Sequence, residues 1–119
     1  MNAAASLKVL IVEDEALIAM MAEDMVEGLG HTLVATAPTL ADARHAITTL
    51  DFDAALLDVN LNGDSSMELA AMLKARGVPF AFTTGYGAGG IDPEHRDRPV
   101  LTKPYALADL DTTLSGFVS

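Results

Sequence analysis

The sequence contains no cysteine and few basic residues. Without cysteine there can be no disulfide, no thiolate nucleophile and no cysteine-based zinc site. Only 7 lysines and arginines stand against 17 aspartates and glutamates, and the formal net charge of −10 repels phosphate backbones and anionic membrane surfaces. We therefore expect neither nucleic acid nor membrane among the partners of this protein.

A long hydrophobic run is also missing. The apolar run Val9–Val12 is ended by Glu13, Asp14 and Glu15, so neither a signal peptide nor a membrane span is expected near the N-terminus. Together with the lack of cysteine, this predicts a cytoplasmic protein. A chain of 119 residues can bury one sizeable core but not two, which predicts a single domain over residues 1–119.

Short apolar runs alternate with longer segments of helical period, a pattern typical of parallel strands joined by crossover helices. Five strands are expected, over Leu7–Val12, His31–Ala37, Asp53–Val59, Pro79–Thr84 and Pro99–Thr102. Four helices are expected from apolar stripes at Ile18, Met21, Met25 and Leu29; at Leu40, Ala43, Ile47 and Leu50; at Leu69, Met72 and Leu73; and at Leu107, Leu110, Leu114 and Phe117. The fold class is α/β, a three-layer sandwich with right-handed crossovers.

The expected helix ends carry local signals. Thr39 with Asp42, and Ser65 with Glu68, are typical capping pairs. A further helix, the fourth in order, would have to form between residues 85 and 98, where glycines and prolines predict a short or frayed one.

Carboxylate, hydroxyl or ammonium side chains follow four of the five strands: Glu13 and Asp14, then Asp58, Thr84 and Lys103. In open α/β sheets, function gathers at the carboxyl ends of the strands. Three carboxylates and one ammonium leave two negative charges, which a divalent cation would neutralise. Because the available ligands are oxygens, Mg²⁺ is favoured, with Mn²⁺ as the alternative.

Such a site suits phosphoryl transfer, which needs a nucleophile, a metal and donors to the phosphoryl oxygens. Asp58 can be the nucleophile and form an acyl phosphate. Asp14 is expected to bind the metal directly and Glu13 through water, while Asp58 and the backbone carbonyl of Asn60 complete the ligand set. Thr84 and Lys103 remain as donors to the phosphoryl oxygens.

These motifs resemble the receiver domain of two-component response regulators over the whole chain. The matching stretches are "LIVEDE", "LLDVNLNG", "FTTGYG" and "LTKPY", in the family order and spacing. The resemblance implies a flavodoxin-like (βα)5 fold with strand order 2-1-3-4-5. It also implies that Asp58 accepts a phosphoryl group from a histidine kinase with Mg²⁺, followed by slow self-catalysed hydrolysis and no other enzyme activity.

One position departs from the usual receiver pattern. Most similar receivers have an aromatic residue three positions before the lysine, where this sequence has Val100, so no ring can rotate to report phosphorylation. "FTTGYG" instead resembles the FAT GUY subfamily of stand-alone receivers, although Thr83 and Gly87 differ from its signature. That resemblance implies a kinase partner of the HWE or a related type.

The stretch "FAFTTGYGAGG" lacks the lysine of a P-loop. We expect Gly85 to leave space beside the phosphoacceptor. Our hypothesis is that Thr84, when drawn toward the phosphoryl group, orders residues 85–90 and so reports phosphorylation. Tyr86 and Tyr105 are interpreted equally as packing residues or as partner contacts.

The sequence favours one of three candidate functions. The favoured one is a signalling receiver with no output domain, most simply a monomer, which acts through protein contacts or as a phosphoryl shuttle or sink with a histidine phosphotransfer protein. A phosphatase with an aspartyl nucleophile needs an acid two positions after Asp58, where the sequence has Asn60. A degenerate receiver is disfavoured because every expected site residue is present.

Overall fold

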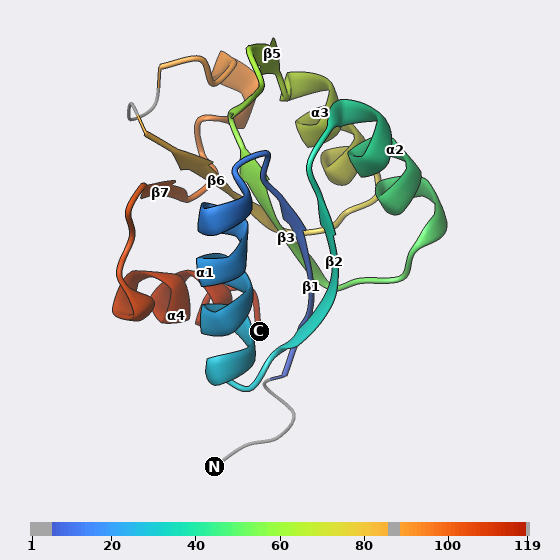
Figure 1. Cartoon of the computed structure of the whole chain (residues 1–119). Helices are drawn as coiled ribbons and strands as arrows, with labels where there is room; N and C mark the ends of the chain where they lie inside the picture. The colour runs from blue at the N-terminus through green and yellow to red at the C-terminus, as the bar shows by residue number, and fades with distance from the viewer. Residues whose placement is uncertain (1–5, 86–88, 119) are drawn as a thin grey trace.

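The centre of the molecule is a parallel sheet of five strands (Figure 1). The computed structural model describes residues 6–85 and 89–118. The strands of the sheet are β1 (Lys8–Val12), β2 (Thr32–Ala37), β3 (Ala54–Asp58), β6 (Phe80–Thr84) and β7 (Val100–Thr102). Their order, β2-β1-β3-β6-β7, confirms the predicted 2-1-3-4-5 arrangement of main strands.

Helices cover both faces of this sheet. They are α1 (Ala16–Gly28), α2 (Leu40–Thr49), α3 (Met67–Ala75) and α4 (Leu107–Ser115). Figure 1 shows α1 and α4 on one side of the sheet and α2 and α3 on the other. Between β6 and β7, the described residues form only a short 3-10 helix, η2 (Pro93–His95), which agrees with the short fourth helix expected there. None of the helices in the described residues is both long and apolar enough to cross a membrane.

The core has two halves, one on each face of the sheet. Alternate residues of β1 point to opposite faces, with Leu10 and Val12 in the half that α2 and α3 cover and Val9 and Ile11 in the half that α1 and α4 cover. The middle strand β3 is buried at every position, as a strand covered on both faces requires. This burial fixes the position of Asp58 at the end of β3.

Helix α1 presents a different face to the core than the sequence predicts, whereas α4 buries Leu110 and Leu114 as predicted and departs only at Leu107. Met21 and Leu107 were expected in buried stripes, but they are 46% and 48% exposed. In α1 the fully packed positions are Ala19, Ala22 and Val26, one residue further along the helix. Because alanine side chains are small, this face lets α1 lie close to the sheet, and the larger apolar side chains are turned to its flanks.

Of the two predicted capping pairs, the one before α2 is confirmed and the one before α3 is confirmed only for its serine. The N–H of Asp42 donates to Thr39 Oγ1 over 3.1 Å at the start of α2. The helix α3 begins one residue later than the Ser65 and Glu68 pair requires, with Ser66 as its first flanking residue, but Ser65 Oγ still accepts from the N–H of Met67 at 3.3 Å. Glu68 instead accepts from Arg44 of α2 at 2.7 Å, because the two helices lie side by side.

A short hairpin that the sequence analysis did not predict follows β3. Its strands are β4 (Asn60–Leu61) and β5 (Asp64–Ser65), which pair antiparallel. The two turn residues, Asn62 and Gly63, both have positive φ, at 54° and 89°. An Asn-Gly pair suits such a turn because both residues tolerate this conformation. The hairpin stands beside the end of β3.

Candidate phosphoacceptor site

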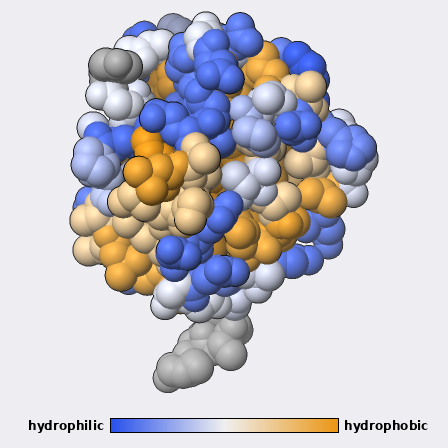
Figure 2. Space-filling model, viewed as in Figure 1, coloured by the Kyte–Doolittle hydropathy of each residue, from blue (hydrophilic) through white to orange (hydrophobic). Residues whose placement is uncertain are grey.

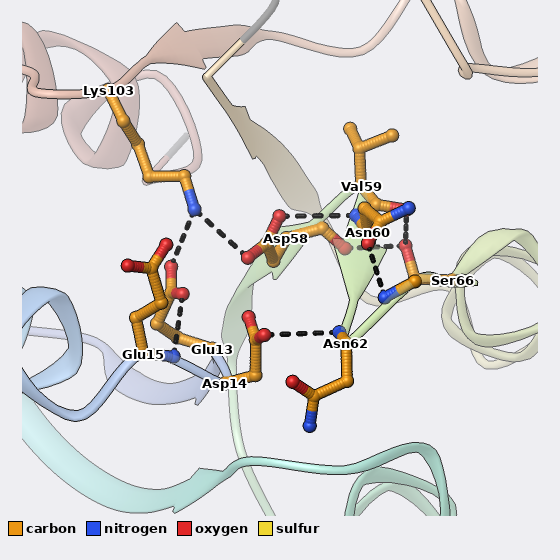
Figure 3. Close-up of polar contacts among 10 residues, drawn as sticks. Glu13, Asp14, Glu15, Asp58, Val59, Asn60, Asn62, Ser66 and Lys103 are labelled. Carbon is orange, nitrogen blue, oxygen red and sulfur yellow. Dashed lines mark hydrogen bonds and ion pairs between the residues drawn. The ribbon is translucent and has the colours of Figure 1, made fainter.

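The acidic residues that follow β1 and β3 come together at the carboxyl edge of the sheet. β1 and β3 are neighbours, with Val12 opposite Leu57, so Glu13, Asp14 and Asp58 end on the same edge. One carboxylate oxygen from each of these three residues lies within 4.8 Å of the others. Figure 3 shows the three side chains converging from the ends of the two strands. The sequence-predicted acidic cluster therefore exists.

Lys103 reaches this cluster from the end of β7, which pairs with β6 on the side away from β3. It follows β7, and its Nζ lies 2.9 Å from Asp58 Oδ2 and 3.0 Å from Glu13 Oε1 (Figure 3). Burial lowers the pKa of the Lys103 ammonium, but the hydrogen bonds to the two carboxylates and their negative charges together outweigh burial and raise that pKa. Lys103 is thus a fixed positive charge between two negative ones.

Glu13 is a buried carboxylate whose charged form is disfavoured by its surroundings. It is 4% exposed. Burial raises the pKa of its carboxyl to about 7, and the hydrogen bonds from Lys103 and from the N–H of Glu15 counter only part of this effect. The nearby charge of Asp58 acts in the same direction as burial. A cation at this site would therefore stabilise the charged form of Glu13.

Asp58 has a hydrogen bond on each side of its carboxylate. Oδ2 accepts from Lys103, and Oδ1 accepts from the N–H of Asn60 at 3.2 Å. Asn60 was expected to contribute its backbone carbonyl to a metal. The Oδ1 of its side chain accepts from the N–H of Gly63 at 2.8 Å, which ties Asn60 into the hairpin.

Thr84 and Gly85 lie at the same edge, at the end of β6. Thr84 is 3% exposed, and its carbonyl accepts from the N–H of Lys103 at 2.7 Å. Both residues line a cavity of about 690 Å³ that also contains Asp14, Asp58 and Lys103. The expected donors to a phosphoryl group, Thr84 and Lys103, thus line the same cavity as Asp58.

The cavity continues away from the carboxylates along an apolar wall. Residues of α1 and of the segment after β7 form this wall, namely Ile18, Met21, Ala22, Met25, Pro104 and Tyr105. Figure 2 shows hydrophobic and polar side chains interspersed on the face of the molecule that carries α1. Leu17, Met20 and Met21 are the large exposed apolar side chains of α1.

Of the two tyrosines interpreted as packing residues or partner contacts, Tyr105 lies among the described residues and Tyr86 does not. Tyr105 lines the cavity, packs partly buried against the core on the α1 side, and has a pKa raised to about 12, chiefly by burial and then by the charge of Glu13. Tyr86 lies outside the described residues, as do positions 87 and 88 of the predicted switch segment. Val100, which stands where most receivers have an aromatic ring, is 36% exposed on β7.

Sequence reasoning missed two residues that touch this site. The N–H of Asn62, at the tip of the hairpin, donates to Asp14 Oδ2 at 3.0 Å (Figure 3). Ser66 is fully buried, and its hydroxyl contacts the carbonyl of Asp58 at 2.5 Å. The Asn-Gly pair could have indicated the hairpin, but the capping pattern points to Ser65, and no local pattern indicates a role for Ser66 beside it.

The ligand set fits a hard divalent cation. All the candidate side-chain ligands are carboxylate oxygens, and the three carboxylates carry more negative charge than Lys103 can balance. A parallel α/β sheet with such a cluster at its carboxyl edge is typical of proteins that handle phosphoryl groups. The chain belongs to the response regulator receiver domain family, whose model matches residues 9–115.

Relatives support this assignment in sequence and in structure. The transcriptional regulatory protein TcrA of Mycobacterium tuberculosis is 37% identical over 114 residues, which cover 87% of this chain and 42% of TcrA. The phyllosphere-induced regulator PhyR of Methylorubrum extorquens is 34% identical over 113 residues, covering 91% of this chain and 42% of PhyR. The chain thus spans less than half the length of these curated relatives.

A solved structure matches the chain over its whole length. The solution structure of SdrG from Sphingomonas melonis Fr1 is 43% identical, covers 100% of both chains and has a TM-score of 0.86. A solution structure of the BeF3-activated conformation of SdrG has a TM-score of 0.81 at the same identity. The family and the fold are therefore established independently of the site geometry.

Proposed function

We propose that this receiver domain accepts a phosphoryl group on Asp58 from the phosphohistidine of a histidine kinase and signals through protein contacts. The observation that carries the proposal is the position of Lys103 Nζ, which lies within 3.0 Å of both Asp58 and Glu13 at the carboxyl edge of the sheet. Lys103 can stay with Asp58 as the carboxylate becomes an acyl phosphate, because a lysine ammonium has three donor hydrogens.

The chemical step is a displacement at phosphorus. A carboxylate oxygen of Asp58 attacks the phosphorus atom, an oxygen–phosphorus bond forms, and the nitrogen–phosphorus bond of the phosphohistidine breaks with its electron pair passing to the imidazole. The hydroxyl of Thr84 and the ammonium of Lys103 donate to the phosphoryl oxygens. Gly85, which has no side chain, leaves room for them. Water later cleaves the acyl phosphate and regenerates the Asp58 carboxylate.

The residues that would hold Mg²⁺, or Mn²⁺, are Asp14, Asp58 and the backbone carbonyl of Asn60, with Glu13 acting through a bound water. The fit rests on the all-oxygen ligand set and on the net negative charge that Lys103 leaves unbalanced. A bound cation would neutralise negative charge on the phosphoryl oxygens. Asn62 holds one oxygen of Asp14 through its N–H, which leaves the other oxygen for the cation.

Self-phosphorylation and self-dephosphorylation would be the only reactions of this chain. A phosphatase with an aspartyl nucleophile would need an acid or base two positions after Asp58. That position is Asn60, whose side-chain oxygen already accepts a hydrogen bond from Gly63. A role as phosphoryl shuttle or sink with a histidine phosphotransfer protein uses the same chemistry and differs only in the partner.

The partner class and the subfamily follow from the motif around β6. We assign the chain to the FAT GUY subfamily, with a histidine kinase of the HWE or a related type as donor, on the basis of the stretch "FTTGYG" and of Val100. Tyr105, which lines the cavity beside Lys103, is the described tyrosine placed to contact such a partner. The single-domain, monomeric and cytoplasmic character expected from the sequence stays a prediction.

Intact mass spectrometry tests the phosphoacceptor directly. The wild-type chain, incubated with acetyl phosphate and Mg²⁺, should gain the mass of one phosphoryl group, and Asp58→Asn should gain none. Asp64→Asn is the matched control, because Asp64 is an exposed carboxylate in the neighbouring hairpin. A gain that persists in Asp58→Asn, or is missing in the wild type, would overturn the assignment. Phosphotransfer profiling with purified kinases then identifies the donor.

A further inference from the structure

Ser66 is a buried serine that flanks α3 but does not cap it. It is 0% exposed, and its side chain makes no hydrogen bond to the first turn of its own helix. Thr39, at the same position before α2, accepts from Asp42 in the usual way. The side chain of Ser66 is therefore used elsewhere.

The hydroxyl of Ser66 points back to the end of β3. Its Oγ lies 2.5 Å from the carbonyl oxygen of Asp58 and 3.0 Å from that of Val59, and it donates its one hydrogen between them. The N–H of Ser66 also donates to the carbonyl of Val59, at 3.1 Å. Figure 3 shows Ser66 beside Val59 and Asn60, on the side away from Lys103.

These contacts hold both ends of one peptide group. The carbonyl of Val59 and the N–H of Asn60 belong to the same planar unit, and that N–H donates to Asp58 Oδ1 at 3.2 Å. Ser66 binds the oxygen end of the unit and the Asp58 carboxylate binds its nitrogen end. If the peptide rotated, the N–H of Asn60 would leave the carboxylate and the carbonyl of Val59 would leave the hydroxyl of Ser66.

We propose that Ser66 is a positioning residue for phosphoryl transfer to Asp58, because its hydroxyl fixes the peptide between Val59 and Asn60. The fixed peptide orients the Asp58 carboxylate for attack and holds in place the backbone of Asn60, whose carbonyl would bind the cation. This inference rests on the proposed function of Asp58. Ser66 itself touches neither the phosphoryl group nor the cation, so it acts only through its neighbours.

The test compares Ser66→Ala with Thr39→Ala. Both changes remove a hydroxyl beside a helix start, but Thr39 has no contact with the acidic site among its hydrogen bonds in the described residues. For each variant we would measure the melting temperature, the Mg²⁺ affinity by calorimetry and the phosphorylation rate with acetyl phosphate by intact mass. Ser66→Ala should lower both the affinity and the rate roughly tenfold, as loss of an orienting contact does at metal sites. Thr39→Ala should change only the melting temperature.

Two further variants cover the case in which Ser66→Ala fails to fold. Ser66→Cys nearly keeps the volume but has a weaker donor, and it should lose affinity and rate in the same direction. Ser66→Thr keeps the hydroxyl and should restore both toward the wild-type values. In the nitrogen-15 spectrum of the folded variants, the Asn60 amide resonance should move in Ser66→Ala and return in Ser66→Thr.

The outcomes separate the two proposals. Wild-type affinity and rate in Ser66→Ala, or equal losses in Thr39→Ala, would make Ser66 a purely structural residue and overturn the inference. If the wild-type chain gained no phosphoryl group, the proposed function would fail, and the Mg²⁺ affinities of the same variants would then decide the role of Ser66.

Discussion

Lys103 Nζ lies 2.9 Å from Asp58 Oδ2, although 45 residues separate the two in the sequence. The same ammonium lies 3.0 Å from Glu13, and the Lys103 side chain is only 11% exposed. Lys103 therefore has two opposing effects on the site. It repels a cation that approaches the carboxylates, and it attracts the oxygens of an incoming phosphoryl group.

Replacing Lys103 with methionine should separate these two effects. Lys103→Met keeps most of the side-chain volume and removes the charge, so Mg²⁺ affinity should rise several-fold because a nearby positive charge is gone. Phosphorylation by acetyl phosphate should become roughly 100-fold slower, because a donor to the phosphoryl oxygens is lost. Calorimetry and intact mass spectrometry measure the two quantities.

Lys8→Met is the matched control for this change. Lys8 pairs with Asp51 at 3.1 Å on the exposed surface, far along the strand from the acidic cluster. It should alter neither Mg²⁺ affinity nor phosphorylation. Equal phosphorylation rates in Lys103→Met and the wild type would mean that Lys103 takes no part in the chemical step.

The sequence predicted the site better than it predicted the surfaces of the helices. Carboxylates placed directly after buried strands must meet when those strands are parallel neighbours, so Asp14 and Asp58 could be paired from the pattern alone. The buried face of α1 could not be predicted in the same way. It depends on how closely Ala19 and Ala22 let the helix approach the sheet, which is a property of tertiary packing.

Ser66 shows a second limit of sequence reasoning. A serine next to a helix start is ordinarily interpreted as a cap. Here the neighbouring Ser65 fits the capping pattern better. The hydroxyl of Ser66 instead donates to the carbonyls of Asp58 and Val59. These carbonyls are buried, and buried carbonyls need a hydrogen-bond donor. Such a contact becomes visible only when the turn between β3 and α3 is known.

Mg²⁺ should stabilise the fold through Asp14. A ligand that binds only the folded state adds stability, about 2.7 kcal/mol at 100 times its dissociation constant, so the melting temperature of the wild type should rise with Mg²⁺. Asp14→Asn keeps an oxygen for the N–H of Asn62 but loses the charge. We expect its Mg²⁺ affinity to fall roughly tenfold or more, with a correspondingly smaller thermal shift.

Without Mg²⁺, Asp14→Asn should melt at a higher temperature than the wild type, because one of three clustered negative charges is removed. Asp24→Asn, on an exposed part of α1, is the control and should keep the wild-type response to Mg²⁺. A variant Asp14→Asn that still gained the full thermal shift would exclude Asp14 as a metal ligand.

His95 has one buried ring nitrogen without a hydrogen-bond partner among the described residues, while its other nitrogen, Nε2, lies 3.7 Å from Glu94 Oε2. It is 1% exposed in η2, its ring centre lies 6.3 Å from those of Phe80 and Phe82, and its Nδ1 has no hydrogen-bond partner among the described residues. A buried polar atom without a partner costs about 1 to 3 kcal/mol. His95→Leu, of similar volume, should therefore raise the free energy of unfolding by about 1 kcal/mol in urea titrations.

His45→Leu is the comparison for this substitution, because His45 is exposed on α2 and should change the free energy of unfolding by less than about 0.5 kcal/mol. A clear loss of stability in His95→Leu would show that a water or another group satisfies the buried nitrogen in solution.

Tyr105 should ionise well above the ordinary range of tyrosine. Its pKa of about 12 has burial as its main cause, followed by the charge of Glu13. The chain has 2 tyrosines, so Tyr86→Phe leaves Tyr105 as the single phenol, and its titration can be followed by absorbance near the phenolate band. Glu13→Gln should lower the Tyr105 pKa in this background, but burial should keep it above the ordinary value of about 10.

The raised pKa of Tyr105 also predicts how the free energy of unfolding changes with pH in alkaline solution. Between pH 10 and pH 12 the unfolded chain loses the Tyr105 proton while the folded chain keeps it, so the free energy of unfolding should fall as pH rises through that range. Tyr105→Phe cannot lose a proton there and should show a shallower fall than the wild type in urea titrations at each pH. Below pH 10 neither state ionises Tyr105, and the difference between the two proteins should be constant. Parallel curves from pH 9 to pH 12 would mean that the Tyr105 hydroxyl is open to solvent and titrates as it does in the unfolded chain.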